Sequence, residues 1–257
     1  MGTRAIDKME TGINAIKGLR PSGLKKLHNT GRAGSNPATL IRTMNIFAVD
    51  HSPEEAARSL CDKHVTKMIV ESAQLLSTAH RLIDGEQYDG KTLSGRNAKR
   101  WRLTDSSRDD RIYQATFINH PCAIWARSCS SNYLWLAKHA LAMCEEFELR
   151  YEHGHKTKGL IEFFVDNLPV RILHGPLEDF ALAMPEEYKD SGNTVKSYRD
   201  YYIHVKARLA QWKLPDRMPF WFYHGCKSRG VDMLEHENID AIMDFKAQCL
   251  AMPFNKP

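Results

Sequence analysis

Apolar residues recur at helical spacing over most of the chain after residue 44. The clearest stripe lies within residues 60–80, and its members are Cys61, Val65, Met68, Leu75, Leu76 and Ala79. Such spacing places them on one side of a helix. The sequence SPEE at residues 52–55 combines a Ser cap, Pro at the first helical position and acids in the first turn, which is typical of a helix start. We therefore predict one helix from residue 53 to about residue 82.

Helical patterns dominate the rest of the chain as well. The further helices that we expect span residues 121–127, 133–152, 161–167, 193–212 and 236–250. Residues 45–50 are short, apolar and β-leaning, which predicts a strand, and the Gly-, Arg- and Asp-rich residues 84–110 predict a surface loop with a basic centre at 94–102. The predicted fold class is mostly α: an irregular helical bundle with long loops and very little strand.

Composition indicates a globular protein. Hydrophobic residues make up 42% of the 257 residues, enough to build a core. The apolar runs are much shorter than the roughly 18 residues that a membrane span needs, so we expect no membrane partner and a cytoplasmic location. Six cysteines without a close CxxC pair predict reduced, mostly buried thiols.

The net charge of +5 is concentrated at the N-terminus. Residues 1–43 contain eight Lys or Arg and two acids, whereas the remaining 214 residues contain 28 bases and 29 acids. The sequence GSNP at residues 34–37 resembles accidental translation of the T-arm of a transfer RNA gene, which predicts that residues 1–43 are a spurious or disordered extension, that Met44 is the true start and that the genome is phage-like. The alternative is a basic arm that binds nucleic acid or targets an organelle. We expect a helical domain at 44–230 and a C-terminal helix and tail at 231–257.

Three polar side chains share one face of the first long helix. His64, Lys67 and Glu71 stand at positions i, i+3 and i+7, within two helical turns. A carboxylate beside a cation can stabilise positive charge on a reacting sugar, and a histidine can move protons or contact phosphate. The alternative is an ordinary Lys67–Glu71 ion pair beside a core histidine.

Other clusters combine cations with aromatic rings, which can bind phosphate and stack on bases. The candidate substrate-binding residues are Asp62, His120, Trp125, Arg127, Asn132, Tyr133, Arg199, Tyr202, Lys206 and Trp221. Each cluster is also compatible with a buried core or a solvated charged face. The His and Cys spacings match neither a structural zinc site nor HExxH, and nucleotide-binding loops are missing from the sequence, so we expect no metal and no cofactor.

The chain resembles the phage endonuclease V family of pyrimidine-dimer DNA glycosylases with lyase activity. Three features carry the resemblance: Asp62-x-His64 followed by Glu71, a long second helix with Tyr133, Leu136 and Glu145-Glu146, and a late Pro219-x-Trp221-Phe222 segment ending in Gly225-x-Lys227. The resemblance implies an all-α fold, DNA with a flipped base or a kinked duplex as partner, and Glu71 as the essential carboxylate.

Two positions depart from that family, which attacks the sugar with the amine of an N-terminal Thr and has Arg directly before its Glu. Val70 precedes Glu71 here, and a start at Met44 would expose the amine of Met44 or Asn45. Lys67 is another candidate amine, provided that its pKa is depressed. We therefore expect a DNA-acting enzyme of glycosylase or base-modifying type, a hydrolase or transferase. The alternative is a non-catalytic helical nucleic-acid-binding or host-takeover protein of a phage. The sequence indicates no oligomeric state.

Overall fold

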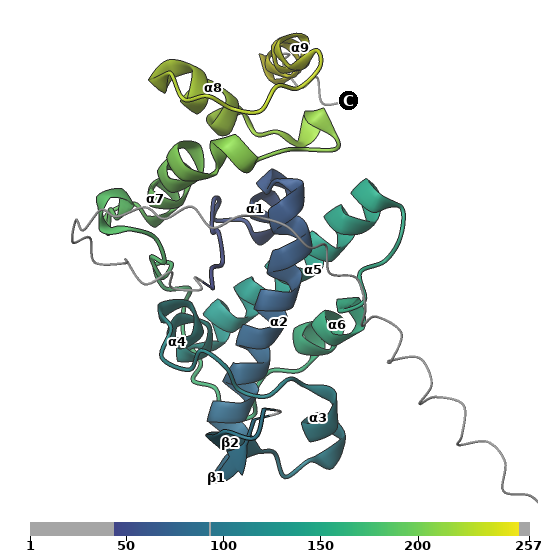
Figure 1. Ribbon diagram of the computed structural model, residues 1–257, viewed down its shortest axis with the longest axis vertical. Coiled ribbons are helices and arrows are strands. Elements are labelled where there is room, and N and C mark those ends of the chain that lie inside the picture. Colours follow the sequence, from purple (N-terminus) through teal and green to yellow (C-terminus); the bar gives the residue numbers. More distant parts are fainter. Residues whose placement is uncertain (1–43, 93, 252–257) are drawn as a thin grey trace, which may run out of the picture. The chain divides into compact units, whose positions relative to one another are not determined.

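Helices α2 (Asp62–Asp84) and α5 (Ser130–Tyr151) pack against each other in the computed structural model, which describes residues 44–92 and 94–251 (Figure 1). Three shorter helices pack on this pair: α1 (Pro53–Ser59), α4 (Pro121–Ser128) and α6 (Lys158–Asp166). The described residues form nine α-helices and one two-stranded sheet, which confirms the prediction of a mostly α fold with very little strand. The predicted extension at 1–43 lies outside the described residues.

The helix predicted from residue 53 to 82 is interrupted at Leu60 and Cys61. Ser52 caps α1 as expected, since its hydroxyl accepts the Glu55 amide. Leu60 and Cys61, however, have extended backbones with ψ of 142° and 160°. Their main-chain groups are satisfied from elsewhere in the fold, because the Cys61 amide donates to the Tyr202 hydroxyl and the Leu60 carbonyl accepts from Arg150. The prediction of one continuous helix was wrong for this reason.

Part of the predicted surface loop at 84–110 is regular structure. Strands β1 (Glu86–Lys91) and β2 (Asn97–Arg102) form an antiparallel hairpin, and α3 (Ser106–Arg111) follows it. Arg81, buried at the C-terminal end of α2, holds this region: its guanidinium donates to the carbonyl of Trp101 and forms an ion pair with Asp109. The local sequence did not predict this regular structure because the contacts that stabilise it come from Arg81 in α2.

Residues 44–49 are buried but do not form the predicted strand. Phe47 has a left-handed φ of 42°, and the Val49 amide donates to the Phe47 carbonyl across a tight turn. The Asn45 side chain accepts both the Ile46 and the Phe47 amides through Oδ1. This segment therefore satisfies its main chain locally instead of pairing with another strand.

The C-terminal half contains shorter elements than predicted. The helix expected at 193–212 is divided into three elements in the structure. These are α7 (Thr194–Tyr201), the π-helical turn η2 (Tyr202–Lys206) and the 3-10 turn η3 (Ala207–Leu209). The remaining elements are the 3-10 turns η1 (Glu186–Tyr188) and η4 (Pro215–Arg217) and the helices α8 (Phe220–Arg229) and α9 (Ile239–Ala251). Lys246 of α9 donates to the carbonyls of Asp216 and Met218, so α9 is fastened to η4.

The cysteines agree with the expectation from composition. Five are buried, Cys249 is exposed, and all six carry free thiols. Among the helices that the structure describes, none has both the length and the apolar character required to cross a bilayer.

Candidate functional site

The carboxylate of Glu71 lies at the middle of α2 and is only 13% exposed. Its Oε1 atom is 2.8 Å from the Nζ of Lys67, one helical turn earlier, whose side chain is 61% exposed. Its Oε2 atom accepts the main-chain amide of Asn45 at 3.3 Å. One oxygen thus meets a solvent-facing cation, while the other meets the buried segment that begins at Met44. The Lys67–Glu71 contact is the i,i+4 ion pair of the alternative interpretation, and a catalytic role for these two residues stays a prediction.

His64 shares the face of Glu71 but is turned into the core. It is 7% exposed, its Nδ1 is 2.7 Å from the Tyr202 hydroxyl, and its ring stacks on Phe47 with centroids 4.3 Å apart. Burial, and then the nearby cations Lys206, Lys67 and Lys63, lower the pKa of His64 to about 3. His64 is therefore neutral at physiological pH.

Phe47 connects His64 to the elements η2 and α7. Its ring lies 5.6 Å from that of Tyr202 and 6.4 Å from that of Tyr201, and the Nζ of Lys206 lies 5.9 Å from its centroid. Tyr202 is fully buried and Lys206 is half-buried. Three of the predicted residues, His64, Tyr202 and Lys206, thus surround one aromatic side chain that the sequence did not single out.

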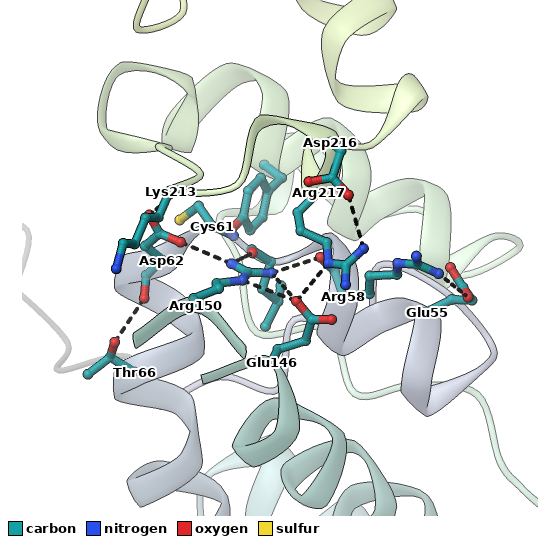
Figure 2. A network of polar contacts seen from close by, with 12 residues as sticks. Glu55, Arg58, Cys61, Asp62, Thr66, Glu146, Arg150, Lys213, Asp216 and Arg217 are labelled. Atoms are coloured by element: carbon teal, nitrogen blue, oxygen red, sulfur yellow. Dashed lines mark hydrogen bonds and ion pairs between the residues drawn. The ribbon is translucent and has the colours of Figure 1, made fainter. Parts of the chain in front are cut away.

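Asp62 belongs to a different network, centred on Arg150 of α5 (Figure 2). The guanidinium of Arg150 is fully buried, and it donates to the carboxylates of Asp62 and Glu146 and to the carbonyls of Arg58 and Leu60. The second oxygen of Asp62 accepts the Lys213 amide at 2.6 Å. Asp62 consequently ties the start of α2 to α5 and to the segment before η4.

The predicted cluster around α4 has mostly interior contacts. His120 caps α4 by accepting the Cys122 amide, and Trp125 packs between Trp135 and Phe180. Arg127 is half-buried, and burial lowers its pKa. The prediction that this cluster contacts a substrate stays a prediction.

Two further predicted residues, Asn132 and Tyr133, are buried at the start of α5. The Asn132 amide group donates to the Trp125 carbonyl and to Glu178, and the Tyr133 hydroxyl is 2.7 Å from Nε2 of His80. Both side chains are 0% exposed. Their observed contacts hold α5 in the fold.

Arg199 and Trp221 lie together at the edge of a hollow of about 460 Å³. The Arg199 guanidinium is 5.4 Å from the Trp221 ring centroid, and it also donates to the Val49 carbonyl and to Asp50. Lys196 and Arg229 line the same hollow, and both form ion pairs with Asp200. This site combines an aromatic ring with several cations, and a contact of Arg199 and Trp221 with a substrate stays a prediction.

Three contributors to these sites were missed in the sequence: Asn45, Phe47 and Arg150. The local sequence gives no sign that Phe47 has a positive φ. An arginine in the last turn of a helix, such as Arg150, is ordinarily expected to face solvent, but Arg150 is buried. Their importance arises from contacts more than 15 residues away along the chain. Within residues 44–92 and 94–251, no group of three or more His, Cys, Asp or Glu side chains is arranged to hold a metal ion.

Part of the chain is similar to a known protein family. Residues 44–159 match the family model described as pyrimidine dimer DNA glycosylase. The match begins at Met44 and contains Asn45, His64, Lys67 and Glu71, which confirms the resemblance over this segment. It supports a function of DNA glycosylase type, with DNA as the partner. No significant match to a curated protein or to a solved structure was found.

Proposed function

We propose that the chain is a DNA glycosylase that acts on damaged pyrimidines, with Glu71 as the carboxylate of the reaction. The observation that supports this most directly is the position of Glu71 within the family match, largely buried and in contact with both Lys67 and the Asn45 nitrogen. A carboxylate held in such a partly dry site is well placed to stabilise positive charge.

The reaction that fits this arrangement takes place at the sugar C1′ carbon. An amine lone pair attacks C1′ while the bond from C1′ to the pyrimidine nitrogen breaks, and its electrons leave with the base, which then takes up a proton. The attached nitrogen then loses a proton, the bond from C1′ to the ring oxygen O4′ breaks as O4′ takes up a proton, and the nitrogen lone pair forms the C=N bond of a protonated imine. Glu71 would stabilise the cationic character of C1′ in the transition state and afterwards the positive charge of the imine.

The amine in this proposal is the α-amine of a chain that starts at Met44. The Asn45 nitrogen lies 3.3 Å from Glu71 Oε2, so an α-amine on Met44 would be one residue away from the carboxylate, and removal of Met44 would place it at the contact itself. Lys67 is the other candidate, but its ammonium is held in an ion pair with Glu71 and has no free electron pair in that state.

The remaining predicted residues would position the reacting groups and the DNA. His64 would keep Phe47, and with it the 44–49 segment, against α2. Arg127, Arg199, Lys206 and Trp221 would contact the DNA backbone or a stacked base, because each of these side chains remains partly exposed. A cytoplasmic location and a phage origin also stay predictions.

The first test replaces one atom of the carboxylate. Glu71→Gln should lower turnover of a duplex containing a pyrimidine dimer by at least about 100-fold and leave its dissociation constant nearly unchanged. If the substitution weakens binding or folding but turnover per bound complex persists, the alternative of a non-catalytic nucleic-acid-binding protein is favoured.

The second test identifies the amine. Mass spectrometry of the protein made from its native gene should find Met44 or Asn45 at the N-terminus. Borohydride added during turnover should deliver hydride to the imine carbon and leave a covalent protein–DNA adduct on the N-terminal peptide. An adduct on Lys67 would reassign the nucleophile, and turnover without any adduct would indicate attack by water. A base-modifying transferase would instead leave the glycosidic bond intact.

A further inference from the structure

The β1–β2 hairpin carries several positively charged side chains that have no carboxylate partner among the residues that the structure describes. Residues 86–102 contain five Lys or Arg and two acids. Within the described part of the chain, none of the five cations forms an ion pair, whereas Lys196, Arg199 and Arg229 around the other hollow are all paired with aspartates. Cations without a carboxylate partner are free to meet phosphates.

One face of the hairpin combines these cations with an exposed aromatic ring. The register pairs Tyr88 with Arg100 and Glu86 with Arg102, so these four side chains lie on the same face. The Arg102 guanidinium is 5.0 Å from the centroid of the Tyr88 ring, which is 39% exposed. The opposite face is anchored to the protein at its base through the buried Trp101.

The same face is hollowed beside the small residue Gly90. A Cβ atom at Gly90 would approach the Arg100 Cγ to 2.9 Å and the Tyr88 ring to 3.1 Å, so a larger residue would displace both. A hollow of about 670 Å³ lies beside these residues, and its lining is completed by Lys91, Thr92, Ser94 and Gln114. Guanidinium, hydroxyl and amide groups beside an aromatic ring together suit the phosphates and sugars of a nucleic acid.

The hairpin follows the C-terminal end of α2, the helix that carries Glu71 near its middle. Thr78, seven residues after Glu71, lies on nearly the same helical face, and Arg81 is turned about 80° from Glu71 around the helix. Thr78 and Arg81 both contact the segment that carries Gln114: the Thr116 amide donates to Thr78, and Arg81 donates to the Tyr113 carbonyl. The 13 residue steps from Glu71 to Asp84 at the end of α2 correspond to about 20 Å at 1.5 Å per residue.

We infer that the β1–β2 hairpin is a second contact for duplex DNA that lies along α2, in which Arg100 and Arg102 bind phosphates to one side of the nucleotide at Glu71. A rise of 3.4 Å per base pair puts this contact about six base pairs away. A two-stranded ribbon of this kind fits against a groove of the duplex. The inference rests on the proposed function only in taking DNA as the ligand.

The test measures equilibrium binding of the full chain to an undamaged duplex at several potassium chloride concentrations. The variant Arg100→Gln with Arg102→Gln should bind more weakly, and the slope of log Kd against log salt should fall by about 2. The pair Arg100→Lys with Arg102→Lys should restore the slope, because charge is kept. The matched control, Lys138→Gln with Lys156→Gln, removes two exposed charges from α5 and the loop after it and should leave the slope unchanged.

Three results would overturn the inference. The glutamine pair could bind with the wild-type slope, the control pair could lower the slope equally, or a duplex RNA of the same sequence could bind as tightly and respond equally to the glutamine pair. Thermal unfolding of each variant verifies that the exposed substitutions leave the fold intact. Loss of turnover in Glu71→Gln concerns the proposed function alone, since binding to undamaged DNA involves no reaction.

A footprint on a dimer-containing duplex tests the placement. The wild-type chain should protect DNA at the dimer and about six base pairs to one side, and the glutamine pair should lose only the distant protection. Retention of the distant protection in that variant would contradict the assigned position of the hairpin.

Discussion

The Oε2 atom of Glu71 accepts the amide of Asn45, a residue 26 positions earlier in the chain, at 3.3 Å. The other oxygen of the same carboxylate lies 2.8 Å from Lys67. Glu71 is thus the point at which the central helix meets the segment that opens the described chain. In the proposed reaction, this carboxylate would act on an amine from that segment.

Replacing Lys67 distinguishes a supporting cation from the nucleophile. Lys67→Met should lower turnover by about tenfold, since Glu71 loses the partner that orients it, and Lys67→Arg should retain most activity. The free energy of unfolding should change by less than about 1 kcal/mol, because the pair is an exposed i,i+4 pair on one side. A loss in Lys67→Arg as large as that in Glu71→Gln would identify Lys67 as the attacking amine.

Phe47 should be required for the position of Asn45. Phe47→Ala removes a 4% exposed ring that contacts His64, Tyr201 and Tyr202, and it should cost about 3 to 5 kcal/mol of unfolding free energy in urea titrations. Turnover measured where the variant is still folded should fall as well. Phe47→Leu leaves a smaller cavity than Phe47→Ala, so its unfolding free energy should lie between those of Phe47→Ala and the wild type. Equal stability of Phe47→Ala and the wild type would contradict the packing described.

Arg150 should be among the most sensitive charged residues for stability. Arg150→Met leaves the carboxylates of Asp62 and Glu146 without their buried partner, which should cost about 3 to 5 kcal/mol. Arg58→Met is the control, because Arg58 is 52% exposed and pairs with Glu55 at 3.7 Å, and it should change stability by about 0.5 kcal/mol or less. Chemical denaturation at neutral pH measures both, and comparable effects would show that the buried network contributes little.

Stability should fall as the solution becomes acidic, because three buried histidines resist protonation. Burial lowers the pKa of His64 to about 3 and those of His80 and His139 to about 4. An unfolded histidine has a pKa of about 6.5, so below that pH the unfolded state binds protons that the folded state does not. The stabilisation is complete above pH 6.5 and is lost progressively as the pH falls towards the folded pKa values.

Between pH 7 and pH 5 this linkage should remove about 2 kcal/mol for each of the three histidines. Urea unfolding at the two pH values measures the loss. His64→Phe keeps a ring beside Phe47 and should reduce the difference between pH 7 and pH 5 by about 2 kcal/mol, whatever its effect at neutral pH. An unchanged difference would show that His64 already titrates normally in the folded state.

The elements that depend on neighbouring residues were predictable. The Ser52 cap, the proline at the start of α4 and the apolar stripe of α2 gave helices where expected, since caps and amphipathic spacing act within a few turns. The Lys67–Glu71 pair was predictable for the same reason. The break at Leu60 and Cys61 was not, because it depends on Arg150 and Tyr202, which lie about 90 and 140 residues away.

The sequence by itself therefore determined the mostly helical class, the helical row of His64, Lys67 and Glu71, and the resemblance to a glycosylase family over the segment that the family model matches. Only the tertiary structure decided which of these side chains faces solvent: Lys67 does, Glu71 is mostly covered, and His64 points into an aromatic core. Helical spacing specifies the angle of a side chain about the helix axis. Its burial and its partners depend on the elements that pack against that axis, and those come from distant parts of the chain.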